Sequence, residues 1–291
     1  MNIEHRTSNF SDERETAFGV RRSAFDVRCW FLLNSGSCPP AFNMALDEAL
    51  LEGISRLGKP VLRFYSWTEP AATFGYFQKY AEVERATRLR PLIRRPTGGG
   101  IVPHDADWTY SLVFPPGHEW PELKAEESYR RVHEWIRAAF AQLNVATELA
   151  PRSRKLQPPT RSRRGQEAPS SNAECGVRSA ESTQRLLTSA ATAALPGQCF
   201  SGYEKFDLLR QGKKIAGAAQ RRNKLGLLIQ GSVQPPLASS ARADWQQAMA
   251  NAARVEFGVA WSDFAPDEPL RERAESLARQ KYSQPEFIGR R

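Results

Sequence analysis

The sequence predicts an α/β protein in which short strands pair into a sheet and amphipathic helices cover it. Apolar runs bounded by turn residues, such as 61–67 and 226–230, are typical of strands. Apolar side chains at helical spacing over 41–54 and 125–143 indicate two long helices. With 41% hydrophobic and 25% charged residues, the 291-residue chain has the composition of a globular protein with a sizeable core.

The first half of the chain is expected to alternate strands and helices after a flexible N-terminal arm at 1–27, which carries no periodic pattern. The expected elements are a strand at 29–33, a helix at 41–54, strands at 61–67 and 72–77, a strand at 92–95, a strand at 108–114 and a helix at 125–143. A Glu69-Pro70 turn separates the strands at 61–67 and 72–77, so we expect these two to pair in one sheet. The charges at Asp47, Glu48 and Glu52 fall between the apolar residues of the first helix.

The second half contains a segment of different composition. Residues 152–198 are rich in Ser, Arg, Pro, Thr and Ala and poor in large apolar side chains, so they cannot bury enough surface to offset the entropy of ordering. We therefore expect one domain over 28–285, interrupted by a disordered basic insertion at 152–198. Beyond the insertion we expect strands at 206–209, 214–219 and 226–230 and helices at 241–257 and 269–281.

Charge and cysteine usage limit the classes of partner and compartment. The formal net charge is +9, and residues 152–198 carry eight basic against three acidic side chains, so acidic partners are favoured. No apolar run reaches the length of about 18 that a membrane span needs, and no secretory signal is visible, so we expect a cytoplasmic protein without membrane contact. The four cysteines show neither a CxxC pair nor zinc-ligand spacing, so reduced thiols and no metal site are expected.

A glycine-rich stretch is the first candidate for chemistry. Gly98, Gly99 and Gly100 follow two arginines between two expected strands, where backbone N–H groups can approach an anion or a carbonyl oxygen without a Cβ in the way. An ordinary tight loop is the alternative. The stretch is neither a Walker loop nor a GxGxxG motif.

Three single residues are candidates for proton, charge or nucleophile roles. His104 follows the glycines and is suited to proton exchange or hydrogen bonding, with a surface histidine as the alternative. Lys214 begins an apolar strand and is suited to hold a carbonyl or phosphate oxygen, with a solvated turn lysine as the alternative. Cys199 lies at the edge of the insertion, where a thiolate nucleophile or a small buried apolar residue is expected.

Three motifs occur in one order along the chain: PAFNMALDEALL at 40–51, RRPTGGGIVPHD at 94–105 and KIAGAAQR at 214–221. Together they resemble the biotin/lipoate protein ligase family (lipoate-protein ligase A-like) over about residues 29–150 and 199–285. The resemblance implies an α/β (α+β) catalytic domain with a mixed, largely antiparallel sheet flanked by helices. Cys199-Phe200, followed by Asp207 and by Gln230-Gly-Ser-Val, is similar to the cysteine-dependent octanoyltransferases that act on the glycine-cleavage H protein.

This resemblance implies a monomeric acyltransferase of protein lipoylation that needs no cofactor. An octanoyl or lipoyl group would pass from octanoyl-acyl carrier protein to a lysine of a lipoyl domain or H protein, through a thioester on Cys199 with Lys214 as the second catalytic residue. The matching family positions that would contact substrate are Arg95, Thr97, Gly98, Gly99, Gly100, Ile101, Val102, His104, Gly217 and Ala218.

Two alternatives stay open. The Gly-Gly-Gly loop also matches the ATP-dependent lipoate-protein ligases, in which ATP and Mg would activate a free acid as an acyl-adenylate and Cys199 would be dispensable. A non-catalytic relative that binds nucleic acid through the basic insertion is the other interpretation.

Overall fold

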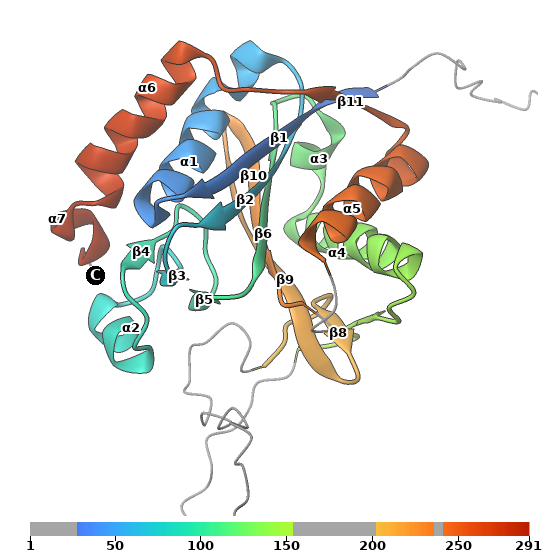
Figure 1. Cartoon of the computed structure of the whole chain (residues 1–291), viewed down its shortest axis with the longest axis horizontal. Coiled ribbons are helices and arrows are strands. Elements are labelled where there is room, and N and C mark those ends of the chain that lie inside the picture. Colours follow the sequence, from blue (N-terminus) through green and yellow to red (C-terminus); the bar gives the residue numbers. More distant parts are fainter. Residues whose placement is uncertain (1–27, 154–201, 236–240, 291) are drawn as a thin grey trace, which may run out of the picture.

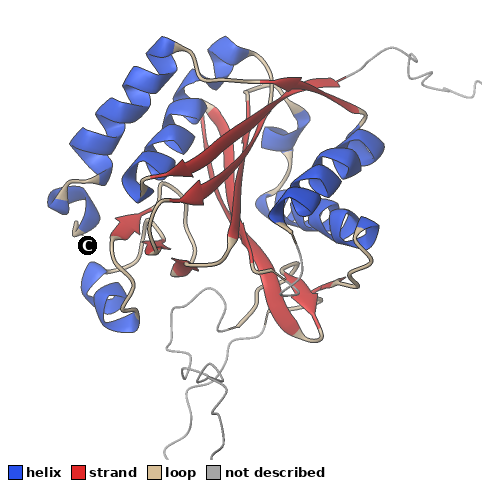
Figure 2. Cartoon of the chain, in the orientation of Figure 1, coloured by secondary structure: helices blue, strands red, loops and turns tan. Residues whose placement is uncertain are grey.

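The computed structural model describes residues 28–153, 202–235 and 241–290. These residues form two sheets, and helices cover both faces of the larger one (Figures 1 and 2). The predicted N-terminal arm, nearly all of the predicted insertion at 152–198 and Cys199 lie outside the described residues.

The larger sheet has eight strands in the order β11-β1-β2-β6-β10-β9-β8-β7. They are β1 (Arg28–Cys38), β2 (Val61–Trp67), β6 (Trp108–Phe114), β7 (Glu148–Leu149), β8 (Leu208–Arg210), β9 (Lys213–Asn223), β10 (Gly226–Val233) and β11 (Val259–Asp263). β1 runs parallel to both β2 and β11, whereas every pairing from β2 to β7 is antiparallel. The predicted α/β class with a mixed, largely antiparallel sheet is confirmed.

The smaller sheet has the order β4-β3-β5 and consists of β3 (Ala71–Phe74), β4 (Leu92–Arg94) and β5 (Val102–His104). The expected pairing of the strands at 61–67 and 72–77 is wrong, because β1 and β6 occupy both edges of β2. β3 also ends earlier than predicted. Gly75 turns the chain there, since its N–H donates to the Gln78 side chain and its carbonyl accepts from the Gln78 N–H.

Two layers of helices enclose the larger sheet (Figure 1). The helices are α1 (Pro40–Leu57), α2 (Tyr80–Ala86), α3 (Glu119–Glu122), α4 (Ala125–Gln142), α5 (Arg242–Phe257), α6 (Glu268–Leu277), the π-helix η1 (Ala278–Tyr282) and α7 (Pro285–Ile288). α1 and α6 pack on one face in a core of aliphatic residues, and α4 and α5 pack on the other around several tryptophans. The helices predicted at 41–54 and 125–143 are confirmed, whereas the one predicted at 269–281 continues from α6 into η1. None of the helices in the described ranges is long and apolar enough to cross a membrane.

Local sequence explains where α1 begins and ends. Pro40 is its first residue, where the fixed φ of proline suits a helix and its missing N–H removes no hydrogen bond. Gly58 ends it in the left-handed conformation with φ of 70°, and its N–H donates to the Ile54 carbonyl. The buried side of α1 contains the polar residues Asn43, Asp47 and Glu48 beside its apolar ones, which brings charge into the protein interior.

Glu48 of α1 connects the helix to the C-terminal segment. Its carboxylate accepts from Lys281 Nζ at 2.6 Å and from the Tyr282 hydroxyl at 2.7 Å. Burial favours the neutral acid, but these donors outweigh it and hold the pKa of Glu48 below its ordinary value. The ionised carboxylate therefore fixes η1 against α1.

His133 on α4 makes folding stability depend on pH. The side chain is buried, and burial, with the Lys214 ammonium as a second cause, lowers its pKa from 6.5 to about 3. Its contribution is fully present above pH 6.5 and is lost as pH falls, because the unfolded chain then takes up a proton that the native state excludes. When the pH is lowered from about 7 to about 5, the free energy of unfolding of wild type should fall by about 2 kcal/mol more than that of His133→Leu. Urea unfolding at each pH measures the two values. If the stability of either His133→Leu or His133→Gln changed with pH in parallel with that of wild type, this expectation would be contradicted.

Candidate functional site

A pocket lies between the smaller sheet and strands β9 and β10 of the larger one. It contains about 410 Å³ of empty space, including the part that opens to solvent. The predicted substrate-binding residues on its wall are Arg95, Gly99, Val102, His104, Gly217 and Ala218. The structure thus brings both the glycine-rich motif and the Lys214 strand to one cavity.

The other predicted substrate-binding residues lie behind this wall. Thr97 donates its hydroxyl to Gln230 Oε1 at 2.7 Å. The carbonyls of Gly98 and Gly100 accept from Arg95 Nη2 at 2.7 and 2.8 Å. Ile101 packs in the small core beneath β3 and β4. These four residues shape the loop from within.

Close packing and positive φ require glycine in and beside this loop. Gly99 has φ of 91°, and a Cβ there would lie 3.1 Å from Arg95 Nη2. A Cβ on Gly75, at the end of β3, would lie 2.0 Å from the Gly99 carbonyl oxygen. The turn after β3 and the glycine-rich loop are therefore in backbone contact, which the sequence pattern did not indicate.

His104 is a buried residue with both ring nitrogens engaged. It is 4% exposed, so the interpretation as a surface histidine is wrong. Nδ1 lies 2.9 Å from Asp107 Oδ2 and Nε2 lies 2.8 Å from Thr73 Oγ1. The Trp67 ring stacks on the imidazole at a centroid distance of 3.9 Å. His104 is thus held by three residues at the pocket wall.

Lys214 forms a buried ion pair. Its Nζ lies 2.7 Å from Asp207 Oδ2, and the two side chains are only 6% and 7% exposed, so the interpretation as a solvated turn lysine is wrong. Burial raises the pKa of Asp207, and the Lys214 ammonium partly opposes that rise. A Cβ on Gly217 would lie 2.6 Å from Lys214 Cε and 2.7 Å from Nζ. Gly217 therefore leaves the space through which the lysine reaches Asp207.

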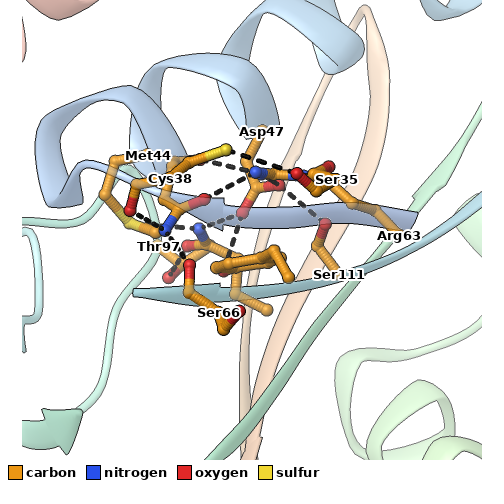
Figure 3. A network of polar contacts seen from close by, with 11 residues as sticks. Ser35, Cys38, Met44, Asp47, Arg63, Ser66, Thr97 and Ser111 are labelled. Atoms are coloured by element: carbon orange, nitrogen blue, oxygen red, sulfur yellow. Dashed lines mark hydrogen bonds and ion pairs between the residues drawn. The ribbon is translucent and has the colours of Figure 1, made fainter. Parts of the chain in front are cut away.

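A fully buried ionic network lies beneath the pocket (Figure 3). Asp47 Oδ1 accepts from Arg63 Nη1 at 2.6 Å and from the Ser111 hydroxyl at 2.7 Å. Its Oδ2 accepts from Gln230 Nε2 at 2.7 Å and from the Tyr65 hydroxyl at 3.1 Å. Gln230 and Tyr65 line the pocket, so the network supports its floor.

Arg63 is the cation of this network, and its donors are distributed over three residues. Nε donates to the Ser35 hydroxyl at 2.8 Å, and Nη2 donates to Asn43 Oδ1 at 2.7 Å. Asp47 accepts from Nη1, and both side chains of the pair are 0% exposed. Every charge is compensated by a close partner, as a buried ion pair requires.

Sequence reasoning missed Thr73, Asp107 and the Asp47–Arg63 pair as site residues, and it noted Asp207 as part of the family motif without giving it a role. A signal existed for Asp47, which lies three residues after Met44 and three before Leu50 and therefore falls on the buried side of the first helix. The structure buries Asp47 completely among these apolar residues, with Arg63 as its buried counter-ion. No comparable local signal marks Thr73.

Cys199, the predicted nucleophile, lies outside the described residues. Among the residues that are described, no group of three or more His, Cys, Asp or Glu side chains is placed to hold a metal ion. Gly99 contributes to the pocket wall, and the Lys214 ammonium lies next to Gly217, which also lines the pocket.

The chain is similar in sequence to known octanoyltransferases. The octanoyltransferase LipM of Geobacillus kaustophilus is 35% identical over 213 residues, which is 70% of this chain and 64% of that protein. The octanoyltransferase LipM of Staphylococcus aureus is 31% identical over 210 residues, covering 70% of this chain and 65% of the relative. The chain thus spans slightly under two thirds of the length of these relatives.

Solved structures share the fold at lower identity. A lipoate-protein ligase A bound with ATP aligns over 90% of this chain and 99% of its own, with a TM-score of 0.62 and 18% identity. A family model described as the lipoyl protein ligase A/B catalytic domain matches residues 39–235, a range that contains the glycine-rich loop, Lys214 and the buried network. The chain belongs to the lipoyl protein ligase A/B catalytic domain family.

Proposed function

We propose that this protein transfers an octanoyl group from octanoyl-acyl carrier protein to a lysine of a lipoyl domain or glycine-cleavage H protein, through a thioester on Cys199. The observation that carries the proposal is the buried Lys214–Asp207 pair beside the pocket that the glycine-rich loop lines. The octanoyltransferase activity named for relatives at 31–35% identity supports the same chemistry.

In the first step the Cys199 thiolate attacks the thioester carbonyl of the donor. A new carbon–sulfur bond forms to Cys199, and the bond to the donor's sulfur breaks, so the donor leaves as a thiolate that takes up a proton. The negative charge that develops on the carbonyl oxygen is stabilised by the Lys214 ammonium and by backbone N–H groups of the glycine-rich loop. Covalent capture divides one transfer into two easier steps.

In the second step the neutral amine of the acceptor lysine attacks the octanoyl-Cys199 carbonyl. The carbon–nitrogen bond forms, the carbon–sulfur bond breaks, and the departing Cys199 sulfur accepts the proton that the amine loses. No cofactor is consumed. Val102 and Ala218 on the pocket wall offer apolar contact to the acyl chain, and Arg95 and His104 hold the loop that faces its carbonyl end.

The test is intact-mass spectrometry after incubation with octanoyl-acyl carrier protein in the absence of ATP. We expect wild type to gain one octanoyl mass that hydroxylamine removes, and Cys199→Ala to gain none. Cys29→Ala is the matched control, because Cys29 is a free cysteine whose thiol pKa is lowered by a hydrogen bond with Ser262. This control should be acylated like wild type.

Two outcomes would overturn the proposal. An adduct that persists in Cys199→Ala would assign the nucleophile to another residue. ATP-dependent acylation of an acceptor domain by both wild type and Cys199→Ala, starting from free octanoate, would make the protein a ligase.

A further inference from the structure

A continuous set of buried contacts joins Asp107 to the glycine-rich loop. Asp107 Oδ2 lies 2.9 Å from His104 Nδ1, and His104 Nε2 lies 2.8 Å from Thr73 Oγ1. Thr73 Oγ1 also accepts from Arg95 Nη1 at 2.9 Å. The Arg95 guanidinium then reaches the Gly98 and Gly100 carbonyls through Nη2. Thr73, at 0% exposure, is the link between the imidazole and the guanidinium.

The chemistry of these groups determines where each proton lies. A guanidinium can only donate, so Thr73 Oγ1 uses one lone pair to accept from Arg95. Asp107 Oδ2 also accepts from the Ser232 hydroxyl at 2.6 Å and from the Thr109 hydroxyl at 3.2 Å, as an ionised carboxylate does. His104 Nδ1 must then carry a proton toward this oxygen. A protonated Nε2 could donate to the second lone pair of Thr73 Oγ1, but the buried hydroxyl proton would then have no acceptor among the contacts of the described residues. The arrangement that satisfies every group has the Thr73 hydroxyl donating to an unprotonated Nε2 of His104.

The direction of these bonds sets the orientation of the loop backbone. Because a trans peptide places its N–H opposite its C=O, a Gly98 carbonyl turned toward Arg95 directs the Gly99 N–H away from the guanidinium. The Gly100 carbonyl does the same for the Ile101 N–H. The positive φ of Gly99 lets both carbonyls converge on the one Nη2 atom. The loop's donor groups are therefore fixed by a side chain that Thr73 holds.

We propose that Thr73 is a positioning residue that, through neutral His104 and Asp107 on one side and Arg95 on the other, presets the glycine-loop N–H groups for the acyl carbonyl. This inference rests on the proposed function for its catalytic consequence, but not for the hydrogen-bond arrangement itself. Thr73 touches no reacting atom in this scheme. Its hydroxyl donates to His104 and accepts from Arg95, so it fixes the position of the guanidinium that holds the loop.

The first experiment reads the arrangement without activity. Nitrogen NMR of histidine-labelled full-length protein near neutral pH, with the His104 signals identified by their loss in His104→Gln, should show a protonated Nδ1 and an unprotonated Nε2. In Thr73→Val the Nε2 resonance should shift, because the hydroxyl that donates to it is removed at nearly constant shape. A protonated Nε2 in wild type would overturn the proposal.

The second experiment reads the consequence for chemistry. In single-turnover formation of the octanoyl-enzyme, Thr73→Val is expected to lower the maximal rate by about tenfold to a hundredfold, since a misplaced oxyanion donor costs somewhat less than a deleted one. The donor concentration at half-maximal rate should change little, because the loss appears in the transition state. Thr73→Ser keeps the hydroxyl and should recover most of the rate.

Thr87→Val is the matched control, because Thr87 follows α2 and its hydroxyl accepts from the nearby Leu89 N–H. Its rate should equal that of wild type. Two results would overturn the positioning role. One is an equal fall of the maximal rate in Thr73→Val and Thr73→Ser, and the other is a change in the donor concentration at half-maximal rate with the maximal rate unchanged. If wild type forms no octanoyl-enzyme, the proposed function fails, while the NMR result still decides the hydrogen-bond arrangement.

Discussion

Lys214→Met is expected to lower the rate of octanoyl transfer by about two to three orders of magnitude, the usual effect of deleting a donor to a developing oxyanion. Methionine keeps much of the length of the lysine stem, so the change removes the charge with little loss of packing, while Asp207 loses its buried counter-ion. The Lys214 side chain is 6% exposed, so water does not replace the ammonium readily. Single-turnover formation of the octanoyl-enzyme measures the loss.

Lys213→Met provides the control for this prediction. Lys213 is the exposed neighbour of Lys214 on the same strand. The Lys213→Met variant should therefore form the octanoyl-enzyme at the wild-type rate. Gly217→Ala tests the same group indirectly, because the new methyl would overlap the present positions of Lys214 Cε and Nζ. It should lower the rate although the lysine is still present. Full activity in Lys214→Met would remove Lys214 from the mechanism.

Asp47→Asn is expected to destabilise the fold by about 3–5 kcal/mol, because it leaves the Arg63 guanidinium buried without a counter-ion. Asp47 accepts hydrogen bonds from Arg63, Ser111, Tyr65 and Gln230, and the amide nitrogen of asparagine cannot accept any of them. Equilibrium urea unfolding of the full chain, followed by circular dichroism, gives the change in free energy. The midpoint should fall while the slope stays constant.

Glu52→Gln is the matched control on the same helix. Glu52 also pairs with an arginine, Arg273, at 2.6 Å, but the two side chains are 32% and 47% exposed. An exposed pair contributes only about 0–1 kcal/mol, so this variant should unfold close to wild type. Equal effects of Asp47→Asn and Glu52→Gln would show that the Asp47–Arg63 network does not hold the pocket floor together.

The arrangement of the site explains why one family motif spans several roles. In the RRPTGGGIVPHD stretch, Arg95 and His104 line the pocket and form hydrogen bonds to other residues of the chain. Gly99 contributes its backbone to the pocket wall. Arg94 donates to the carbonyls of Tyr76, Phe287 and Ile288 and so fixes the turn after β3 to the C-terminal segment. The motif thus builds a rigid loop first and a binding surface second.

The sequence by itself determined the secondary structure of the core and the two stretches that meet at the pocket. Helical spacing over 41–54 and 125–143, and the apolar runs at 61–67 and 108–114, are local patterns that hold wherever the segments are placed. The glycine-rich loop and Lys214 were identified for the same reason, since glycine and lysine at strand ends carry their chemistry in their own covalent structure.

Only the tertiary structure decided which polar residues are buried and what they pair with. Thr73 meets His104 because β3 pairs with β5 in a second sheet, although turn chemistry had favoured pairing β3 with β2. Asp47 became an interior anion because Arg63 on β2 reaches it across 16 positions of sequence, and Lys214 became buried because Asp207 stands across the β8–β9 turn. A charge enters a protein interior only when its partner occupies the adjacent space, and that is a property of the packed chain rather than of any one segment.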